Sequence, residues 1–292
     1  MRVTRLRQKS RRRARLLAAC RASLLAMQAR TLTVQQRDDG VAVVSLARPD
    51  RHNAFDDALI AELTEAFRAI DDDAKVRAVL LRGEGKSFSA GADIAWMREQ
   101  GASDEATNLA GAQRMERAFR AIHDCKKPVL ARVHGAALGG GTGLTAAADI
   151  AIAAESTVFG FTEVRLGILP AVISPYVIEK VGLAKAKALF LLGSRFDARE
   201  AERIGLVFKA VPDASLDAEI EKALGELMKG GPKALAGVKD LLASVGARAV
   251  ADEAVVATTT RAIASIRGSS EAREGLAAFL DKRAPAWTEQ RS

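Results

Sequence analysis

Cysteine, histidine and long apolar runs are all scarce in this sequence of 292 residues. The two cysteines, Cys20 and Cys125, are far apart and match no metal-binding or redox spacing, so we interpret them as unpaired thiols in a reducing compartment. The three histidines match no metal-ligand or catalytic-triad pattern either. Because no apolar run approaches the roughly 18 residues that a membrane span needs, we expect a cytoplasmic protein that contains no metal and binds no membrane.

Acidic residues are absent from the first 26 positions, which hold nine Lys or Arg. Without these nine charges the formal net charge of +8 falls to about −1, so the basic character belongs to the N-terminal segment and not to the folded body. Residues 1–26 have three interpretations: a transit-type segment, an arm that binds nucleic acid, or sequence upstream of a natural start at Met27. We favour the third and expect this extension to be disordered or not native.

Strand-like and helix-like segments alternate between about residues 31 and 212. The β-rich runs "TLTVQQ" and "VAVVSL" flank the turn signal "RDDG", and "DDALIAELTEAFRAIDDD" has the apolar period of a helix. "PYVIEKVG" and "AKAKALFLLG" predict two separate helices, and from about residue 215 the chain is almost wholly helical. We therefore predict an α/β core over residues 27–214 and a helical C-terminal region over residues 215–292.

The stretch "GAALGGGTGLTAAADI", residues 135–150, concentrates glycine where a helix begins. It fits neither a phosphate-binding P-loop nor G-x-G-x-x-G. Unpaired backbone N–H groups at a helix start can stabilise negative charge on a substrate carbonyl oxygen. The alternative is that the glycines only let the helix pack tightly on a strand. A second small-residue loop, "SFSAGADI" at residues 87–94, also precedes a helix, and two such loops can each supply one donor to the same oxygen.

Five blocks of the sequence resemble the enoyl-CoA hydratase/isomerase (crotonase) superfamily over about residues 30–287. They are "RPDRHNAF", "GKSFSAGADI", "ALGGGTGLTAAADIAIAAESTVFGFTEVRLGILP", "AERIGLV" and "EGLAAFLDKRAPAW". The resemblance implies an α/β fold of repeated β-β-α units wound into a spiral, with C-terminal helices that assemble a homotrimer or a dimer of trimers. It also implies an acyl-CoA thioester substrate and no cofactor beyond the coenzyme A that the substrate carries.

The same resemblance assigns the groups that perform the chemistry. Ala92 and Gly140 would donate their backbone N–H groups to the thioester oxygen, and Glu163 in "FGFTEVRLGILP" would transfer protons. Apolar neighbours of Glu163 would raise its pKa, which suits a carboxylate that accepts and returns a proton near neutral pH. The alternative for Glu163 is a structural ion pair with Arg165.

Gly143 stands where many hydratases of the family carry a first glutamate. One carboxylate can pass a proton from water to the α-carbon or move a proton between two carbons, so hydratase and isomerase both remain open. The stretch "AVISPYVIEKVG" is similar to the methylglutaconyl-CoA hydratase branch, which implies a branched or carboxylated enoyl-CoA. We expect the glycine at position 143 to make room for such an acyl group.

The resemblance also places residues around the substrate. Coenzyme A contacts are implied for two loops and, from a neighbouring subunit, for the last helix, and acyl-pocket contacts for the glycine loop and the only tyrosine. These residues are Arg51, Ala54, Ala90, Asp93, Ile94, Gly139, Gly143, Tyr176, Phe279 and Lys282. Two other classes of function stay open: a non-catalytic acyl-CoA binder, and an RNA-binding protein that uses the basic extension, although we do not expect a nucleic-acid partner.

Overall fold

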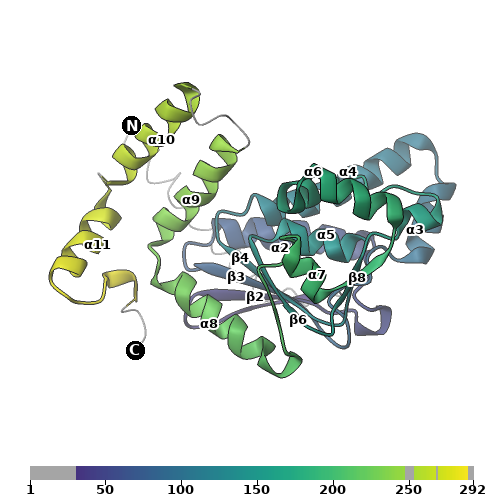
Figure 1. The fold of residues 1–292 in the computed structure, drawn as a ribbon, viewed down its shortest axis with the longest axis horizontal. Coiled ribbons are helices and arrows are strands. Elements are labelled where there is room, and N and C mark those ends of the chain that lie inside the picture. The colour runs from purple at the N-terminus through teal and green to yellow at the C-terminus, as the bar shows by residue number, and fades with distance from the viewer. Residues whose placement is uncertain (1–30, 247–252, 268, 289–292) are drawn as a thin grey trace, which may run out of the picture.

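The computed structural model describes residues 31–246, 253–267 and 269–288 (Figure 1). The basic extension expected over residues 1–26 lies outside these ranges. Among the helices of the described ranges, none is both long enough and apolar enough to cross a bilayer.

A six-stranded sheet forms the centre of the body, with the strand order β1-β2-β3-β4-β6-β9. The predicted hairpin is present: β1 pairs antiparallel with β2, and Gly40 in the turn has a φ of +85°, which glycine adopts without strain. The other pairings in this sheet are parallel. Its strands are β1 (Leu32–Gln36), β2 (Val41–Leu46), β3 (Ala78–Gly83), β4 (Val129–Val133), β6 (Ile150–Ala154) and β9 (Lys209–Val211).

A second sheet contains β5 (Ala136–Leu138), β7 (Val158–Gly160) and β8 (Arg195–Asp197). Successive units of the chain add one strand to the large sheet, one strand to the small sheet and then a helix, as in β4-β5-α5 and β6-β7-α6. An isolated parallel bridge between Ser89 and Ala137 joins the loop after β3 to the small sheet. The expected spiral of β-β-α units is therefore confirmed.

Helices cover both faces of the large sheet. Alternate residues of a strand point to opposite faces, so Ala42 and Val44 join one core with α2, α4 and α5, whereas Val41 and Val43 join another core with α8. The helices around the sheet are α2 (Asp57–Asp72), α3 (Ile94–Ala102), α4 (Glu105–His123), α5 (Gly140–Ala147), α6 (Ser174–Leu192), α7 (Ala198–Arg203) and α8 (Leu216–Lys229).

The two helices predicted from "PYVIEKVG" and "AKAKALFLLG" are the two halves of α6. Gly182 lies between them with a φ of +76°, so the chain bends at this residue and the helix resumes without a connecting loop. The prediction of two helices is therefore confirmed, although a single non-helical residue is all that separates them.

The C-terminal helical region begins with a helix that belongs to the body. Apolar residues of α8 from Leu216 to Met228 are buried against the large sheet. The helices α9 (Pro232–Val245), α10 (Glu253–Arg267) and α11 (Ser270–Leu280) then extend to one side of that body (Figure 1). Lys239 of α9 forms a 2.7 Å ion pair with Asp149, which connects α9 to the body.

Candidate active site

The segments that follow β2, β3 and β4 meet beyond the carboxyl ends of these strands, where open parallel sheets bind ligands. Backbone hydrogen bonds join them: Ala90 N donates to His52 O at 2.8 Å, and Ser89 N donates to Ala136 O at 3.0 Å. The two small-residue loops that the sequence singled out are therefore held side by side.

Ala92 lies where its backbone N–H points away from the neighbouring loop. Phe55 N donates to Gly91 O at 2.7 Å and Asp93 N donates to Phe55 O at 2.9 Å, which is the pattern of a parallel bridge between Phe55 and Ala92. The residues on either side of Ala92 make these bonds, so its own N–H is directed to the opposite side. Within the described residues this N–H makes no backbone hydrogen bond.

Gly140 is the first residue of α5, and its N–H is also without a helical partner. The first hydrogen bond of the helix runs from Gly143 N to Gly139 O at 3.0 Å, which leaves the earlier N–H groups of the helix unbonded within it. Gly139 has a φ of +49° and donates its own N–H to Gly160 O at 2.8 Å. The Gly140 N–H therefore stands at the positive end of the α5 dipole.

Glycine at the contact between the two loops brings these N–H groups together. A Cβ atom on Gly91 would lie 3.2 Å from Gly140 N and 2.6 Å from Leu138 O, and one on Gly140 would lie 2.7 Å from Phe55 Cε2. A side chain at either position would push the loops apart. The sequence left two explanations for the glycines, tight packing and a site with two N–H donors. Both hold, because the tight packing of the loops is what brings the two N–H groups together.

Glu163 reaches the same place from η2 (Glu163–Leu166), a 3₁₀ turn that follows β7. A Cβ atom on Gly139 would lie 2.9 Å from Glu163 Oε1, so the carboxylate lies against the residue before Gly140. The other oxygen, Oε2, is buried without a hydrogen-bond partner in the described part of the chain. Burial raises the pKa of Glu163 above its ordinary value.

The alternative ion pair between Glu163 and Arg165 is not formed. No charge of Arg165 contributes to the pKa of Glu163. Arg165 instead lies over the end of α6, because a Cβ atom on Gly193 would lie 3.4 Å from Arg165 Cγ. A cation at the carboxyl end of a helix is favourable, and this gives Arg165 a structural explanation.

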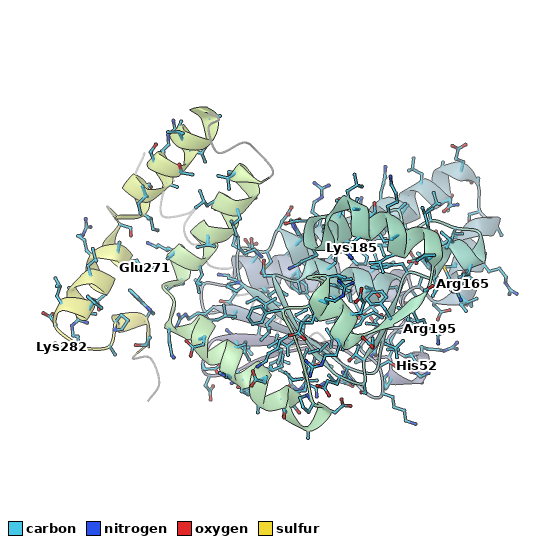
Figure 2. The ribbon with its side chains drawn as sticks, in the orientation of Figure 1. His52, Arg165, Lys185, Arg195, Glu271 and Lys282 are labelled. Atoms are coloured by element: carbon cyan, nitrogen blue, oxygen red, sulfur yellow. The ribbon has the colours of Figure 1, made fainter. Side chains whose placement is uncertain are left out.

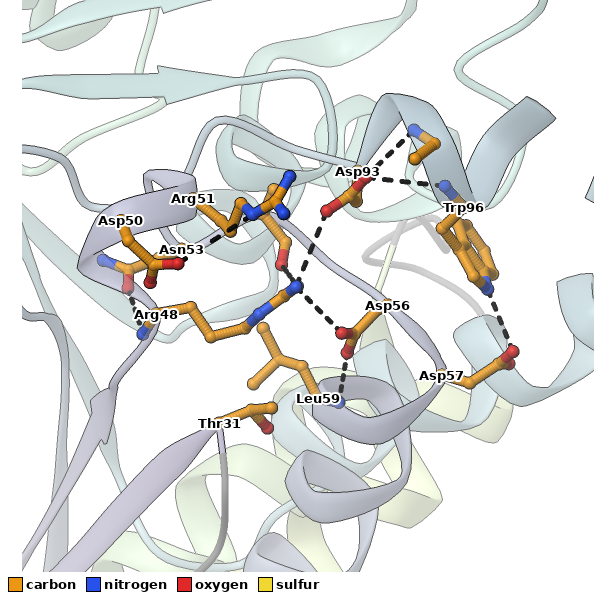
Figure 3. A network of polar contacts seen from close by, with 12 residues as sticks. Thr31, Arg48, Asp50, Arg51, Asn53, Asp56, Asp57, Leu59, Asp93 and Trp96 are labelled. Carbon is orange, nitrogen blue, oxygen red and sulfur yellow. Dashed lines mark hydrogen bonds and ion pairs between the residues drawn. The ribbon is translucent and has the colours of Figure 1, made fainter. Parts of the chain in front are cut away.

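Arg48, which sequence analysis missed, joins the two loops through its guanidinium group (Figure 3). It forms ion pairs with Asp56 at 2.9 Å and with Asp93 at 3.5 Å, and it donates to Ala54 O. Each aspartate also caps the helix that follows it, α2 for Asp56 and α3 for Asp93. Because Asp93 directly follows Ala92, and Ala54 and Asp56 flank its bridge partner Phe55, this network fixes the chain next to the Ala92 N–H. The only signal in the sequence was the place of Arg48 as the first residue of the block "RPDRHNAF".

Some residues that the resemblance assigns to coenzyme A border an open groove of about 730 Å³. Arg51 and Asp93 line it together with Trp96 and Arg98 of α3. Arg98 is an exposed cation that sequence analysis did not identify. Arg51 and Arg98 both have long, flexible side chains, and two such cations beside one groove are suited to binding phosphate groups.

Three further residues of that assignment lie around the same loops. Ala54 is buried, and its carbonyl oxygen accepts a hydrogen bond from Arg48. The backbone N–H of Ala90 donates to the carbonyl oxygen of His52. Ile94, the first residue of α3, is 74% exposed, so its side chain is available to a ligand.

The space beside Gly143 is filled by the protein itself. A Cβ atom on Gly143 would lie 2.3 Å from Ile173 Cγ2 and 3.1 Å from Phe119 Cε1. We expected this glycine to make room for the acyl group of the substrate. This expectation is wrong, because the Ile173 side chain fills the space beside Gly143. Ile173 comes from the segment before α6, and no periodicity in the sequence connects it to Gly143.

Tyr176 is buried in a row of aromatic rings. It stacks on Phe119 with the ring centroids 6.0 Å apart, and Phe119 lies 5.9 Å from Phe55, which contacts Gly140. Burial raises the pKa of Tyr176 to about 12. Tyr176 is thus linked to the donor loop through two other rings.

Phe279 and Lys282 are not brought to these loops within one chain. Figure 2 shows Lys282 at the end of α11, on the opposite side of the molecule from His52. Phe279 is 81% exposed. Any contact of these residues with a substrate at the loops requires a second copy of the chain.

Two backbone donors and one desolvated carboxylate around a small space define a site that can hold a carbonyl oxygen and move a proton beside it. Comparison with known proteins agrees with this class. The model of the enoyl-CoA hydratase/isomerase family matches residues 36–290. A crotonyl-CoA hydratase of Syntrophomonas wolfei is 34% identical over 252 residues, which cover 86% of this chain and 95% of that protein.

Solved structures give the same result. An enoyl-CoA hydratase from Shewanella pealeana superposes with a TM-score of 0.87 at 38% identity, covering 91% of this chain and 99% of that one. An enoyl-CoA hydratase/isomerase from Marinobacter aquaeolei gives a TM-score of 0.84 at 33% identity, covering 89% and 100%. The chain therefore belongs to the enoyl-CoA hydratase/isomerase family, and its fold is the crotonase fold.

Proposed function

We propose that this enzyme adds water to the double bond of a 2-enoyl-CoA thioester. The thioester oxygen accepts hydrogen bonds from the N–H groups of Ala92 and Gly140, and Glu163 transfers the proton. The observation that carries the proposal is the meeting of two unpartnered N–H groups with the Glu163 carboxylate, which lies against Gly139. Enoyl-CoA hydratase is also the activity in the names of the relatives.

The donors act on charge that develops during the reaction. Attack of water on the β-carbon moves electron density onto the thioester oxygen, and the two N–H groups stabilise that negative charge. The α5 dipole adds to this effect at Gly140. Glu163 takes one proton from the attacking water and returns it to the α-carbon, so a single carboxylate closes the proton balance. Its raised pKa suits both steps.

The same carboxylate supports an isomerase reaction as a second candidate. Glu163 is the only carboxylate that the structure places against the glycine loop among the described residues, and one base is enough to move a proton between two carbons of an enoyl chain. Water addition and double-bond migration give different products from one substrate, so product analysis separates them.

We further propose a branched or carboxylated enoyl-CoA, of the methylglutaconyl type, as substrate, and a homotrimer or dimer of trimers as the working form. The substrate proposal is supported by the likeness of the segment around Ile173 and Tyr176 to that branch. The oligomer is supported by large exposed apolar side chains on the C-terminal helices, including Leu276, Phe279 and Leu280. The proposed reaction uses no cofactor besides the coenzyme A of the substrate.

A panel of thioesters tests the substrate proposal. Purified full-length protein would be incubated with straight-chain, 3-methyl-branched and carboxylated 2-enoyl-CoA esters, and the products would be identified by mass spectrometry. We expect a mass increase of one water, with the highest kcat/KM on a branched or carboxylated ester. Equal or better turnover of the straight-chain ester would contradict the substrate class, and a rearranged product of unchanged mass would favour the isomerase.

A further inference from the structure

Gly139, which precedes the first residue of α5, and Gly143, within α5, both lie against the chain segment that runs from η2 to α6. Gly143 N donates to Gly139 O at 3.0 Å, which closes the first turn of the helix, so the two glycines are one turn apart. Glu163 lies against Gly139 and Ile173 lies against Gly143. Two side chains from one chain segment thus lie against glycines that are one helical turn apart.

A change of side-chain rotamer cannot move Ile173 away from Gly143. Its Cβ atom would lie 2.8 Å from a Cβ on Gly143, and this atom is fixed to the backbone and does not move with the side-chain rotamer. Ile173 is 3% exposed, and Phe119, which closes the other side, is 1% exposed. A side chain at position 143 and the isoleucine at position 173 thus exclude each other.

We propose that Gly143 and Ile173 form one coupled position that limits this site to a single carboxylate. Ile173 occupies the volume that an acidic side chain at position 143 would need, one turn from the glycine that Glu163 lies against. The residue at 173 therefore decides how many acids the site holds, and with that which proton-transfer chemistry is open to it. This inference rests on the proposed function for its chemical meaning, but the exclusion itself can be measured without a substrate.

A double-mutant cycle on stability tests the exclusion. The proteins are the wild type, Gly143→Ala, Ile173→Gly and the double variant, with melting temperature as the readout. Gly143→Ala should lower it by roughly 5 °C or more because even the Cβ atom clashes, and Ile173→Gly should lower it by leaving a cavity. In the double variant the Gly143→Ala change should cost much less than in the wild type, because the Ile173 side chain is gone and only the 3.1 Å approach to Phe119 Cε1 remains. Effects that simply add would overturn the proposal.

A second set of variants tests the chemistry. Gly143→Glu alone should fail to fold or melt far below the wild type. Gly143→Glu with Ile173→Gly should fold and should hydrate a straight-chain 2-enoyl-CoA roughly tenfold faster than Ile173→Gly alone. Two carboxylates in one pocket raise the pKa of one of them, so the pH–rate profile should gain an ionisation.

Control variants separate the possible failures. Gly225→Glu in α8, where a Cβ meets no atom within 4 Å, measures the effect of a new glutamate on an open helix surface. A stable Gly143→Glu protein with the melting temperature of Gly225→Glu would overturn the coupling. The double-mutant cycle could show coupling while every protein, the wild type included, is inactive on the enoyl-CoA esters. That result would confirm that residues 143 and 173 exclude each other and would contradict the proposed function.

Discussion

The two oxygens of Glu163 have different surroundings, and this difference shapes what the residue can do. Oε1 lies beside the backbone of Gly139, and Oε2 is buried without a hydrogen-bond partner in the described residues. A charged carboxylate in this position has lost part of its hydration, which raises its pKa. The group is therefore poised to hold a proton and return it.

This raised pKa has a measurable effect on stability. Below the ordinary pKa of glutamate the side chain is neutral in the folded and the unfolded protein, and its burial costs little. As the pH rises through the raised pKa of the folded state, Glu163 becomes charged in its buried position. The contribution of its protonated form to the free energy of unfolding is then lost. Glu163→Gln should therefore melt higher than the wild type at neutral pH, and the difference should shrink as the pH falls toward 4.

Melting curves from pH 4 to pH 8 for both proteins measure this effect, with Glu65→Gln as a control because Glu65 is exposed on α2. The control should show no such pH-dependent gain. A Glu163→Gln protein that is less stable than the wild type at pH 8 would show that the carboxylate has a stabilising partner.

At this scale the sequence singled out Ala92, Gly140 and Glu163, which the structure brings to the same loops, but it gave a wrong reason for Gly143. Ala92, Gly140 and Glu163 are each marked by local features, small residues before a helix or an acid among apolar residues. The partner of Gly143 is a residue from another element, and only packing reveals that Ile173 fills its space.

Among the elements, the loops after β2 and β3 depend on one cation. The Arg48 side chain is 15% exposed and lies between two aspartates that each begin a helix. Its removal would leave two partly buried carboxylates without a counter-charge close to the Ala92 N–H. Arg48→Gln should therefore lower the free energy of unfolding by about 1–3 kcal/mol.

The same variant should affect the reaction more than substrate binding. If the network positions Ala92, kcat of Arg48→Gln should fall roughly tenfold, since one oxyanion donor is worth 10²-fold or more and would be only displaced. Arg48→Lys keeps the charge but not the planar fork, and it should recover part of kcat. Urea unfolding and steady-state kinetics measure both effects, and an unchanged kcat in a destabilised protein would reduce Arg48 to a purely structural role.

The sequence predicted long elements well and short ones poorly. The hairpin, α2 and the buried strands carry clear alternation or helical period. β5, β8 and β9 have three residues each, which is too few for any period to be visible, and they exist because neighbouring strands provide their partners. The long helix α8 shows a different limit of sequence patterns. Its apolar stripe predicts a helix, but it does not predict that this stripe is buried against the large sheet.

In the whole molecule, the helices α9–α11 extend beside the body and expose apolar side chains (Figure 1). Phe279 is 81% exposed and Leu280 is 78% exposed, which is unfavourable unless another surface covers them. Lys282, two residues further on, would then lie at a neighbouring subunit. If it contacts that subunit's nucleotide, each complete site requires groups from two chains.

A mixing experiment tests this arrangement. Lys282→Ala should raise KM for the acyl-CoA several-fold and leave kcat unchanged, because it removes binding and not chemistry. Lys282→Ala subunits mixed with Glu163→Gln subunits, after dissociation and reassembly, should regain a low KM in some sites. Such sites combine Glu163 of one chain with Lys282 of the next. A mixture that merely averages the two parent proteins would contradict a shared site.

The central claim is that Glu163 moves the proton in the hydration of an enoyl-CoA, and Glu163→Gln tests it most directly. Loss of the conjugated double bond measures turnover in the wild type and the variant, and equilibrium titration with a saturated acyl-CoA measures binding. We expect kcat to fall at least about 10²-fold, with the acyl-CoA Kd changed less than about twofold, because the variant leaves the two N–H groups and the groove beside Arg51 and Arg98 unchanged. Turnover by Glu163→Gln at the wild-type rate, in a protein that binds the ester normally, would contradict the account.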